Sequence, residues 1–178
     1  MQNVKGSELF FSYVLENGLV FHDYTNHVIY SVEVSQTYRQ GDQGIECLCR
    51  IRNRWFRASP EEKVRQSILG FLIDNKGYPA GRISVEAEIV RSPKVKRVDI
   101  AVHDEGGRIV MLVECKRPQV AIDSSTLNQA LSYLRELEAP FIFLSNGQSH
   151  HVFQLDMDSR QLVAMDSFPS YDELTAHA

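Results

Sequence analysis

The feature that most constrains the fold is a run of apolar residues at positions 109–113, followed by Glu114, Cys115 and Lys116. A run that is apolar at successive rather than alternate positions is typical of a central strand, which is buried on both of its faces. Pro118 ends this run, because proline cannot donate a hydrogen bond to a neighbouring strand. We therefore expect a β-sheet with this strand near its centre.

Two segments have the pattern of helices that can cover such a sheet. The first begins at 59–62, where Ser59 is placed as N-cap, Pro60 as the first helical residue and Glu62 as the third, a capping box. Its apolar residues lie at helical spacing: Val64, Ile68, Leu69 and Leu72. Gly77 and the residues after it end this helix, and a second amphipathic helix is expected at 123–138.

Shorter strands complete the expected sheet. They lie at 83–90, 97–102, 141–144 and 152–155, with hairpin turns at 106–107 and 146–147. The order of helix, antiparallel strands, helix and strands predicts an α/β (α+β) fold, with a central mixed β-sheet flanked by helices. Residues 19–57 also have strand composition, so we expect three parts: an N-terminal β-rich extension at 1–57, a core at 58–157, and a C-terminal strand and tail at 158–178.

The bulk composition narrows the class of protein. The 178 residues are 43% hydrophobic and 24% charged, the balance of one ordinary globular domain. No apolar run approaches the roughly 18 residues that cross a bilayer, and the first residues do not resemble a secretory signal. Three cysteines, Cys47, Cys49 and Cys115, are an odd number without such a signal, which argues against a disulfide framework. We expect a cytoplasmic protein that does not bind a membrane.

A charged cluster closes the apolar strand. Glu114 and Lys116 are two residues apart, so their side chains project from the same face of a strand. Asp99 lies on the neighbouring strand that a hairpin brings alongside, so two carboxylates and one ammonium can converge. Buried charges are costly unless they are paired or bound to a metal, which leaves two interpretations. The cluster is either a chemical site or a structural salt bridge at the end of the sheet.

The residue types suit metal-assisted phosphate chemistry. The carboxylates of Asp99 and Glu114, with the backbone carbonyl of Cys115, are hard oxygen ligands of the kind that Mg²⁺ prefers. Mn²⁺ is expected to substitute for Mg²⁺ as a similar divalent ion. The metal would polarise a phosphate and acidify a bound water. Lys116 would orient that water or remove its proton, and would offset negative charge in the transition state.

The cluster resembles the signature of the PD-(D/E)XK nucleases, with Val98 in the place where proline often stands. A Gln-x-x-x-Tyr pattern at Gln129 and Tyr133 resembles a motif of RecB-like nucleases and type I restriction subunits. Together the chain is similar to the N-terminal nuclease domain of the type I restriction enzyme R (motor) subunit over roughly residues 50–157, which implies a restriction-endonuclease-like core. The segments that carry the similarity are 60–66, 77–79, 97–100, 114–118 and 145–147.

The resemblance implies roles for particular residues. Asp99 and Glu114 would be metal ligands and Lys116 the catalytic lysine. Gln129 and Tyr133 would contact DNA or brace the metal site, and the alternative is an ordinary helix surface that touches the sheet. Glu62 would be the helix glutamate that these nucleases direct at the metal. The capping box accounts for Glu62 without a metal, so Glu61 and Gln66 are alternatives for that role.

Positive charge is concentrated just before Asp99. Lys94, Lys96 and Arg97 lie in this run, and Arg117 follows the catalytic lysine. Such runs are usually solvated loops, but beside a nuclease centre they are candidates for binding the DNA backbone. The chain as a whole has a net charge of −4, which is unusual for a protein that binds DNA alone.

We therefore expect a Mg²⁺-dependent endonuclease-like domain that hydrolyses DNA phosphodiester bonds. The helicase motor of the resembled subunit is not within these residues, so translocation is expected to need a helicase or specificity subunit in trans. A homodimer is a further expected state, because these nucleases often pair to cut both strands. The alternative is a catalytically silent nuclease-fold module that binds DNA or a protein partner, and RNA is an open third substrate class.

Overall fold

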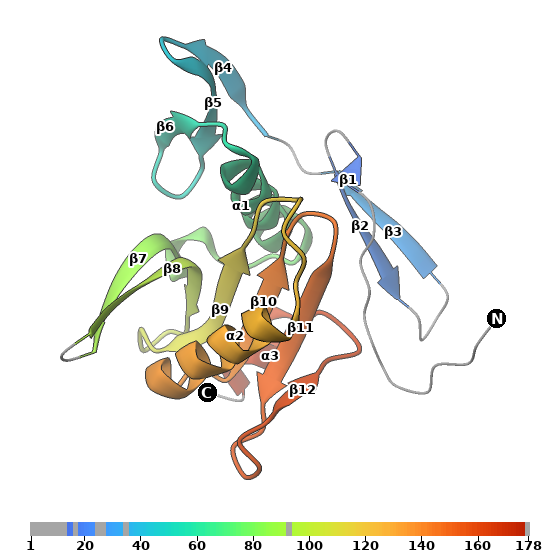
Figure 1. Cartoon of the computed structure of the whole chain (residues 1–178), viewed down its shortest axis with the longest axis vertical. Coiled ribbons are helices and arrows are strands. Elements are labelled where there is room, and N and C mark those ends of the chain that lie inside the picture. Colours follow the sequence, from blue (N-terminus) through green and yellow to red (C-terminus); the bar gives the residue numbers. More distant parts are fainter. Residues whose placement is uncertain (1–13, 16–17, 24–27, 34–35, 92–93, 177–178) are drawn as a thin grey trace.

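The computed structural model describes residues 14–15, 18–23, 28–33, 36–91 and 94–176, with side chains described at 36–89 and 97–176. Its centre is a six-stranded sheet in the order β12-β11-β10-β9-β8-β7 (Figure 1). Strands β9 and β10 are parallel and the other neighbours are antiparallel, so the predicted mixed sheet is confirmed. The strands are β7 Ile83–Arg91, β8 Lys94–His103, β9 Ile109–Cys115, β10 Phe141–Ser145, β11 His150–Leu155 and β12 Leu162–Ala164.

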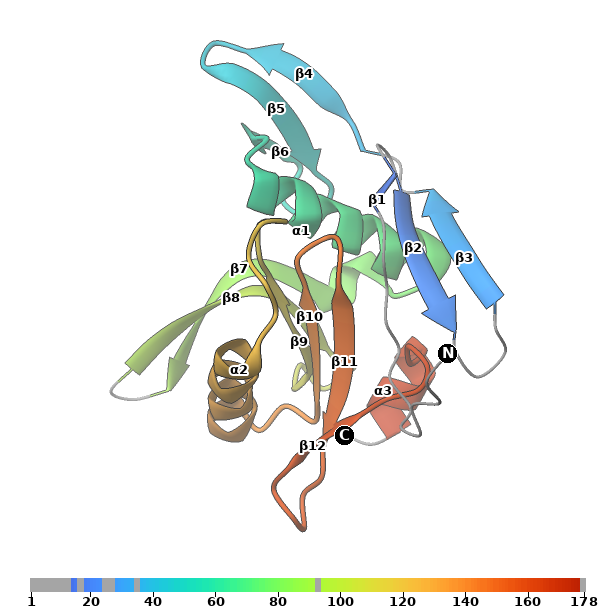
Figure 2. The same ribbon diagram turned by 45° about the vertical axis from the view of Figure 1, so that its right-hand side comes forward.

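Strand β9 occupies the interior of the sheet, as its apolar sequence predicts. Its residues contribute to two hydrophobic clusters on opposite faces, with Val113 in one and Leu112 in the other. Helices α1 (Pro60–Gly70) and α3 (Tyr171–Ala176) cover one face, and α2 (Ser124–Leu137) covers the other (Figures 1 and 2). The α/β class and the flanking helices are therefore confirmed.

Helix α1 begins where the capping box predicts. The Ser59 hydroxyl accepts a hydrogen bond from the backbone N–H of Glu62 at 3.1 Å, and Pro60 is the first helical residue. The chain then continues through a π-helical turn, η1 (Phe71–Asn75), before a short 3₁₀ turn, η2 (Ala80–Arg82). Gly77 separates them with a φ of 69°, a left-handed conformation that glycine adopts at little cost.

In the part of the N-terminal β-rich extension that the structure describes, the strands form two antiparallel sheets of three strands each. The first contains β1 Val14–Leu15, β2 Gly18–Asp23 and β3 Val28–Glu33. The second contains β4 Tyr38–Gly41, β5 Gly44–Cys49 and β6 Arg54–Arg57, and lies beside α1 (Figure 2). Cys47 and Cys49 of β5 are buried and not bonded to each other.

The C-terminal residues complete the core. Phe168 packs edge-on against Phe71 of η1 and Phe143 of β10, with ring centroids 5.0 and 4.9 Å apart. The buried hydroxyl of Tyr78 donates to the backbone carbonyl of Pro169 at 2.8 Å. The segment expected as a strand and tail therefore also supplies a short helix and part of the hydrophobic core. Within the described ranges, no helix is both long enough and apolar enough to cross a membrane.

His150 lies in the interior of the protein, at the start of β11. The sequence offers His150 and His151 no partner at metal-ligand spacing, which predicts a surface position, but this prediction is wrong for His150, which is only 1% exposed. Its Nδ1 lies 2.8 Å from the hydroxyl of Ser145, and its ring stacks against Phe143. Burial, and then the neighbouring His151, lower the pKa of His150 to about 3, so the ring is neutral in the folded protein.

This histidine is expected to make folding sensitive to acid. An unfolded histidine titrates near 6.5, whereas the folded one titrates at about 3. Between these values the unfolded state binds more protons, so stability falls as pH decreases, by up to about 1.4 kcal/mol per pH unit. Chemical unfolding at pH 7 and 4.5 should show a smaller loss in His150→Asn than in the unmodified protein. An equal loss in both proteins would contradict the assignment.

Candidate metal and phosphodiester site

Asp99, Glu114 and Lys116 come together at one end of the β8–β9 pair. The antiparallel register aligns Ile100 with Val113, so Asp99 and Glu114 are the next residues along each strand. One carboxylate oxygen of Asp99, Oδ2, accepts from the backbone N–H of Cys115 at 2.7 Å. The Lys116 ammonium donates to Glu114 Oε1 at 2.6 Å. The hairpin thus places all three charged groups as the sequence predicts.

The cluster carries more negative than positive charge. Burial raises the pKa of the Glu114 carboxyl, the hydrogen bond from Lys116 lowers it, and the charges of Asp99 and Glu61 raise it further, for a net increase. Burial tends to lower the pKa of Lys116, but its hydrogen bond with Glu114 and the nearby carboxylates outweigh that effect and raise it. With the neighbouring ion pairs included, five carboxylates face four cations, which leaves one net negative charge that a bound cation would neutralise: Glu61, Glu62, Glu86, Asp99 and Glu114 against Arg52, Arg65, Arg97 and Lys116.

The two glutamates at the start of α1 have different surroundings. Glu62 is buried, and its carboxylate accepts from Arg65, from Arg52 at 3.3 Å and from Gln66 at 2.8 Å. Glu61 has a side chain that is 48% exposed, and its charge acts on both Glu114 and Lys116. Glu61 is therefore the more accessible of the two, whereas Glu62 and Gln66 belong to the interior.

Arg65 is a site residue that sequence reasoning missed. Its Nη2 donates to Asp99 Oδ1 at 2.7 Å, across 34 residues of chain. The side chain is only 5% exposed. The signal that could have identified it is its position on the buried face of α1, between Val64 and Ile68, where a charged residue needs a partner.

Strand β7 is distorted beside the site. The ladder pairs Val85 with Ile100 and Ala87 with Val98, but Glu86, between them, has a φ of 51°. A non-glycine residue in this conformation inside a strand is strained. Its carboxylate accepts from Arg52 and from Arg97.

The predicted DNA-binding residues differ in their exposure and in their contacts. Arg97 is exposed but forms an ion pair with Glu86. Arg117 is exposed immediately after Lys116. Lys94 and Lys96 lie on β8, and their side chains are outside the described residues. On α2, Gln129 donates to the Tyr133 hydroxyl at 3.1 Å, so the two predicted residues bond to each other.

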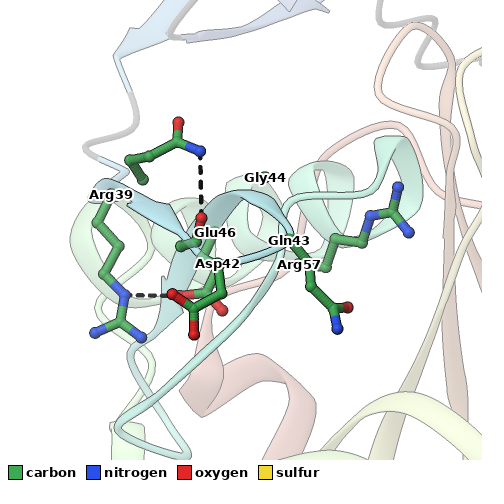
Figure 3. A pocket seen from close by; sticks show the side chains of 8 residues that line it. Arg39, Asp42, Gln43, Gly44, Glu46 and Arg57 are labelled. Atoms are coloured by element: carbon green, nitrogen blue, oxygen red, sulfur yellow. Dashed lines mark hydrogen bonds and ion pairs between the residues drawn. The ribbon is translucent and has the colours of Figure 1, made fainter.

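A polar hollow of about 480 Å³ lies elsewhere, at the β4–β5 hairpin (Figure 3). Arg39 and Arg57 line it together with Asp42 and Glu46, and Arg39 donates to Glu46 at 2.7 Å. Its two guanidinium groups are matched by two carboxylates, so it offers no excess charge to a ligand. No lining residue comes from the sheet that carries Asp99 and Glu114.

The donor set at the charged cluster fits a hard divalent cation. Among the side chains that the structure describes, no three from His, Cys, Asp and Glu stand close enough to hold a metal by themselves. Two carboxylates and the Cys115 carbonyl are nevertheless a suitable set for Mg²⁺, which takes few protein ligands and retains several waters. The negative charge excess around Lys116 favours the same ion.

A comparison with protein families identifies the core. Residues 60–169 match the model of the type I restriction enzyme R protein N terminus, which is more than half of the chain. The chain belongs to this family. The matched part of the R protein N terminus begins at α1 and ends just after Phe168, so it includes the sheet from β7 to β12 and the charged cluster. The β-rich extension precedes it.

Comparison with solved structures gives one similar chain, a fragment assigned as an HsdR subunit of a type I restriction enzyme from Vibrio vulnificus YJ016. It is 20% identical, with a TM-score of 0.48, and the alignment covers 66% of this R protein N-terminal chain. The alignment covers 25% of the solved fragment, so the present chain spans about a quarter of it. No curated protein matches the chain.

Proposed function

We propose that this R protein N-terminal chain is a metal-dependent endonuclease domain that hydrolyses DNA phosphodiester bonds. The observation that carries the proposal is the convergence of Asp99, from the middle of β8, with Glu114 and Lys116 at the C-terminal end of β9, with carboxylates in excess. Membership of a restriction-enzyme family supports DNA as the substrate class.

The acidic and basic residues of the site would have different roles. Asp99, Glu114 and the Cys115 carbonyl would hold Mg²⁺ or Mn²⁺, with Glu61 directed at the same ion. When bound, the metal polarises the scissile phosphate and acidifies a water molecule. Lys116 would orient the attacking water and offset the negative charge that develops as the new P–O bond forms and the bond to the leaving sugar oxygen breaks.

DNA would be held by other groups. Arg117 lies next to Lys116, and we propose that it contacts the DNA backbone together with Lys94 and Lys96. We assign a smaller part to Arg97, because Glu86 already neutralises it. A net charge of −4 gives the chain little non-specific affinity for DNA, so we propose that a helicase or specificity subunit of a restriction complex delivers the substrate.

A cleavage assay tests the function. Plasmid and single-stranded DNA are incubated with the purified chain and Mg²⁺ or Mn²⁺, in parallel with Glu114→Gln. The glutamine removes a charged ligand, so cleavage should fall by about 100-fold or more. Glu105→Gln, which neutralises an exposed carboxylate in the β8–β9 turn, is the matched control and should cut like the unmodified chain.

Two results would contradict the proposal. The first is the absence of cleavage with either metal and either DNA. The second is a Glu114→Gln protein that cuts as fast as the unmodified chain. If the chain binds DNA but does not cut it, and if its metal affinity does not depend on Asp99 and Glu114, the chain would instead be a catalytically silent nuclease-fold module.

A further inference from the structure

The guanidinium of Arg65 connects helix α1 to the charged cluster. Its Nη1 bonds to the buried carboxylate of Glu62, and its Nη2 bonds to Asp99 Oδ1 at 2.7 Å. Two further carboxylates lie close to it, Glu61 at 3.5 Å and Glu86 at 3.6 Å. One buried arginine is therefore surrounded by acidic groups from α1, β7 and β8.

The helix side of this connection is fixed. Glu62 accepts from Gln66 at 2.8 Å and from Arg52 at 3.3 Å in addition to Arg65, and its side chain is only 7% exposed. A carboxylate with three donors has little freedom to rotate. It therefore holds Nη1 in place, and because the guanidinium is planar, it also sets the direction in which Nη2 points.

Asp99 is consequently held by both of its oxygens. Oδ1 accepts from Arg65, while Oδ2 accepts from the backbone N–H of Cys115 at 2.7 Å. Two donors on different oxygens define the rotation of the carboxylate about its last side-chain bond. Each oxygen keeps a second lone pair, which remains available to a metal.

We propose that Arg65 is a positioning residue for Asp99, orienting its carboxylate for the divalent cation of the proposed nuclease site. The inference rests on the proposed function. Partners that hydrogen-bond to a metal ligand are known to affect metal affinity about 10- to 100-fold without touching the ion. Arg65 acts in this way through Asp99.

The backbone of β7 supports a role beyond packing. Glu86 stands at the interrupted position of the ladder, between the pairs on either side of Asp99, and takes a strained φ of 51°. This conformation places its carboxylate with Arg52, Arg97 and, at 3.6 Å, Arg65. Strain of this kind persists where the surroundings enforce it, and it concentrates at functional sites.

Electrostatic repulsion between Arg65 and a metal does not reverse the expected effect. A positive charge near a cation site weakens binding when it is uncompensated. The positive charge of Arg65 is compensated by Glu62, because the two side chains form a direct ion pair and both are buried. Because the Arg65–Glu62 pair has no net charge, loss of the guanidinium mainly removes the hydrogen bond that orients Asp99.

Calorimetric titration with Mn²⁺ alone tests the inference on the full chain. Arg65→Lys keeps the charge, but a single ammonium cannot reach Glu62 and Asp99 with two separate nitrogens. We expect its Mn²⁺ affinity to fall 10- to 100-fold. Arg50→Lys is the matched control, because Arg50 also binds a carboxylate with two nitrogens, at Asp74 on the surface. Its Mn²⁺ affinity should not change.

Two additional variants separate the outcomes. Asp99→Asn should abolish binding, and Glu62→Gln should weaken it in the same direction as Arg65→Lys, which covers the case in which Arg65→Lys does not fold. Thermal unfolding without metal reports folding in each case. Normal Mn²⁺ affinity in folded Arg65→Lys would overturn the inference and leave the nuclease proposal unaffected. If Arg65→Lys does not fold, normal Mn²⁺ affinity in folded Glu62→Gln would have the same meaning. If the unmodified chain does not bind Mn²⁺, or if Asp99→Asn binds Mn²⁺ equally well, both the inference about Arg65 and the nuclease proposal are overturned.

Discussion

Lys116→Met is expected to reduce DNA cleavage by about 100- to 1,000-fold while the protein still folds and binds Mn²⁺. Methionine has a side chain of similar length but no charge, so the packing of the aliphatic part is retained. The ammonium that would stabilise negative charge in the transition state is lost. Initial rates of plasmid cleavage with saturating metal measure the effect.

Metal binding should respond differently from cleavage. In the folded chain the Lys116 ammonium bonds to Glu114, a proposed ligand, at 2.6 Å. Removing the ammonium frees that carboxylate and removes a nearby positive charge, so Mn²⁺ affinity should be unchanged or higher. A loss of cleavage with retained affinity would distinguish a catalytic lysine from a structural salt bridge.

Lys63→Met is the matched control for this substitution. Lys63 is exposed on α1 and lies above the Tyr38 ring at 5.8 Å, outside the charged cluster. The control should cleave normally. Undiminished cleavage by Lys116→Met would remove Lys116 from the mechanism, whatever the role of the two carboxylates.

Phe168→Ala is expected to destabilise the fold by about 3–5 kcal/mol. Phe168 is 6% exposed and fills the space between η1, β10 and Tyr78, with ring centroids 4.9–6.3 Å from its aromatic neighbours. Removing the ring leaves a cavity among side chains that cannot collapse into it. Urea unfolding should show a lower midpoint with an unchanged slope.

Met157→Ala provides the comparison from the same C-terminal region. Met157 is 63% exposed, so its truncation should change stability by no more than about 0.5 kcal/mol. A similarly small change for Phe168→Ala would mean that the C-terminal segment does not contribute to the core. The family match, which extends to residue 169, makes the larger effect the expected one.

Local sequence patterns determined much of this protein. The apolar run before Glu114 specified a central strand, and the capping box specified where α1 begins. The two-residue period of a strand placed Glu114 and Lys116 on one face, and the hairpin aligned Asp99 beside them. These predictions depend on neighbours within about 20 residues, where backbone geometry alone sets the arrangement.

Only the tertiary structure decided which groups surround that cluster. Glu61 and Glu62 are adjacent and chemically identical, and the packing of α1 against the sheet determines that Glu62 is buried beside Arg65 while Glu61 stays exposed. The contact between Arg65 and Asp99, the strained backbone of Glu86 and the burial of His150 likewise depend on packing between separate elements. Such contacts have no local periodic signal, because they are set by how the helices, strands and charged side chains satisfy one another once the core has formed.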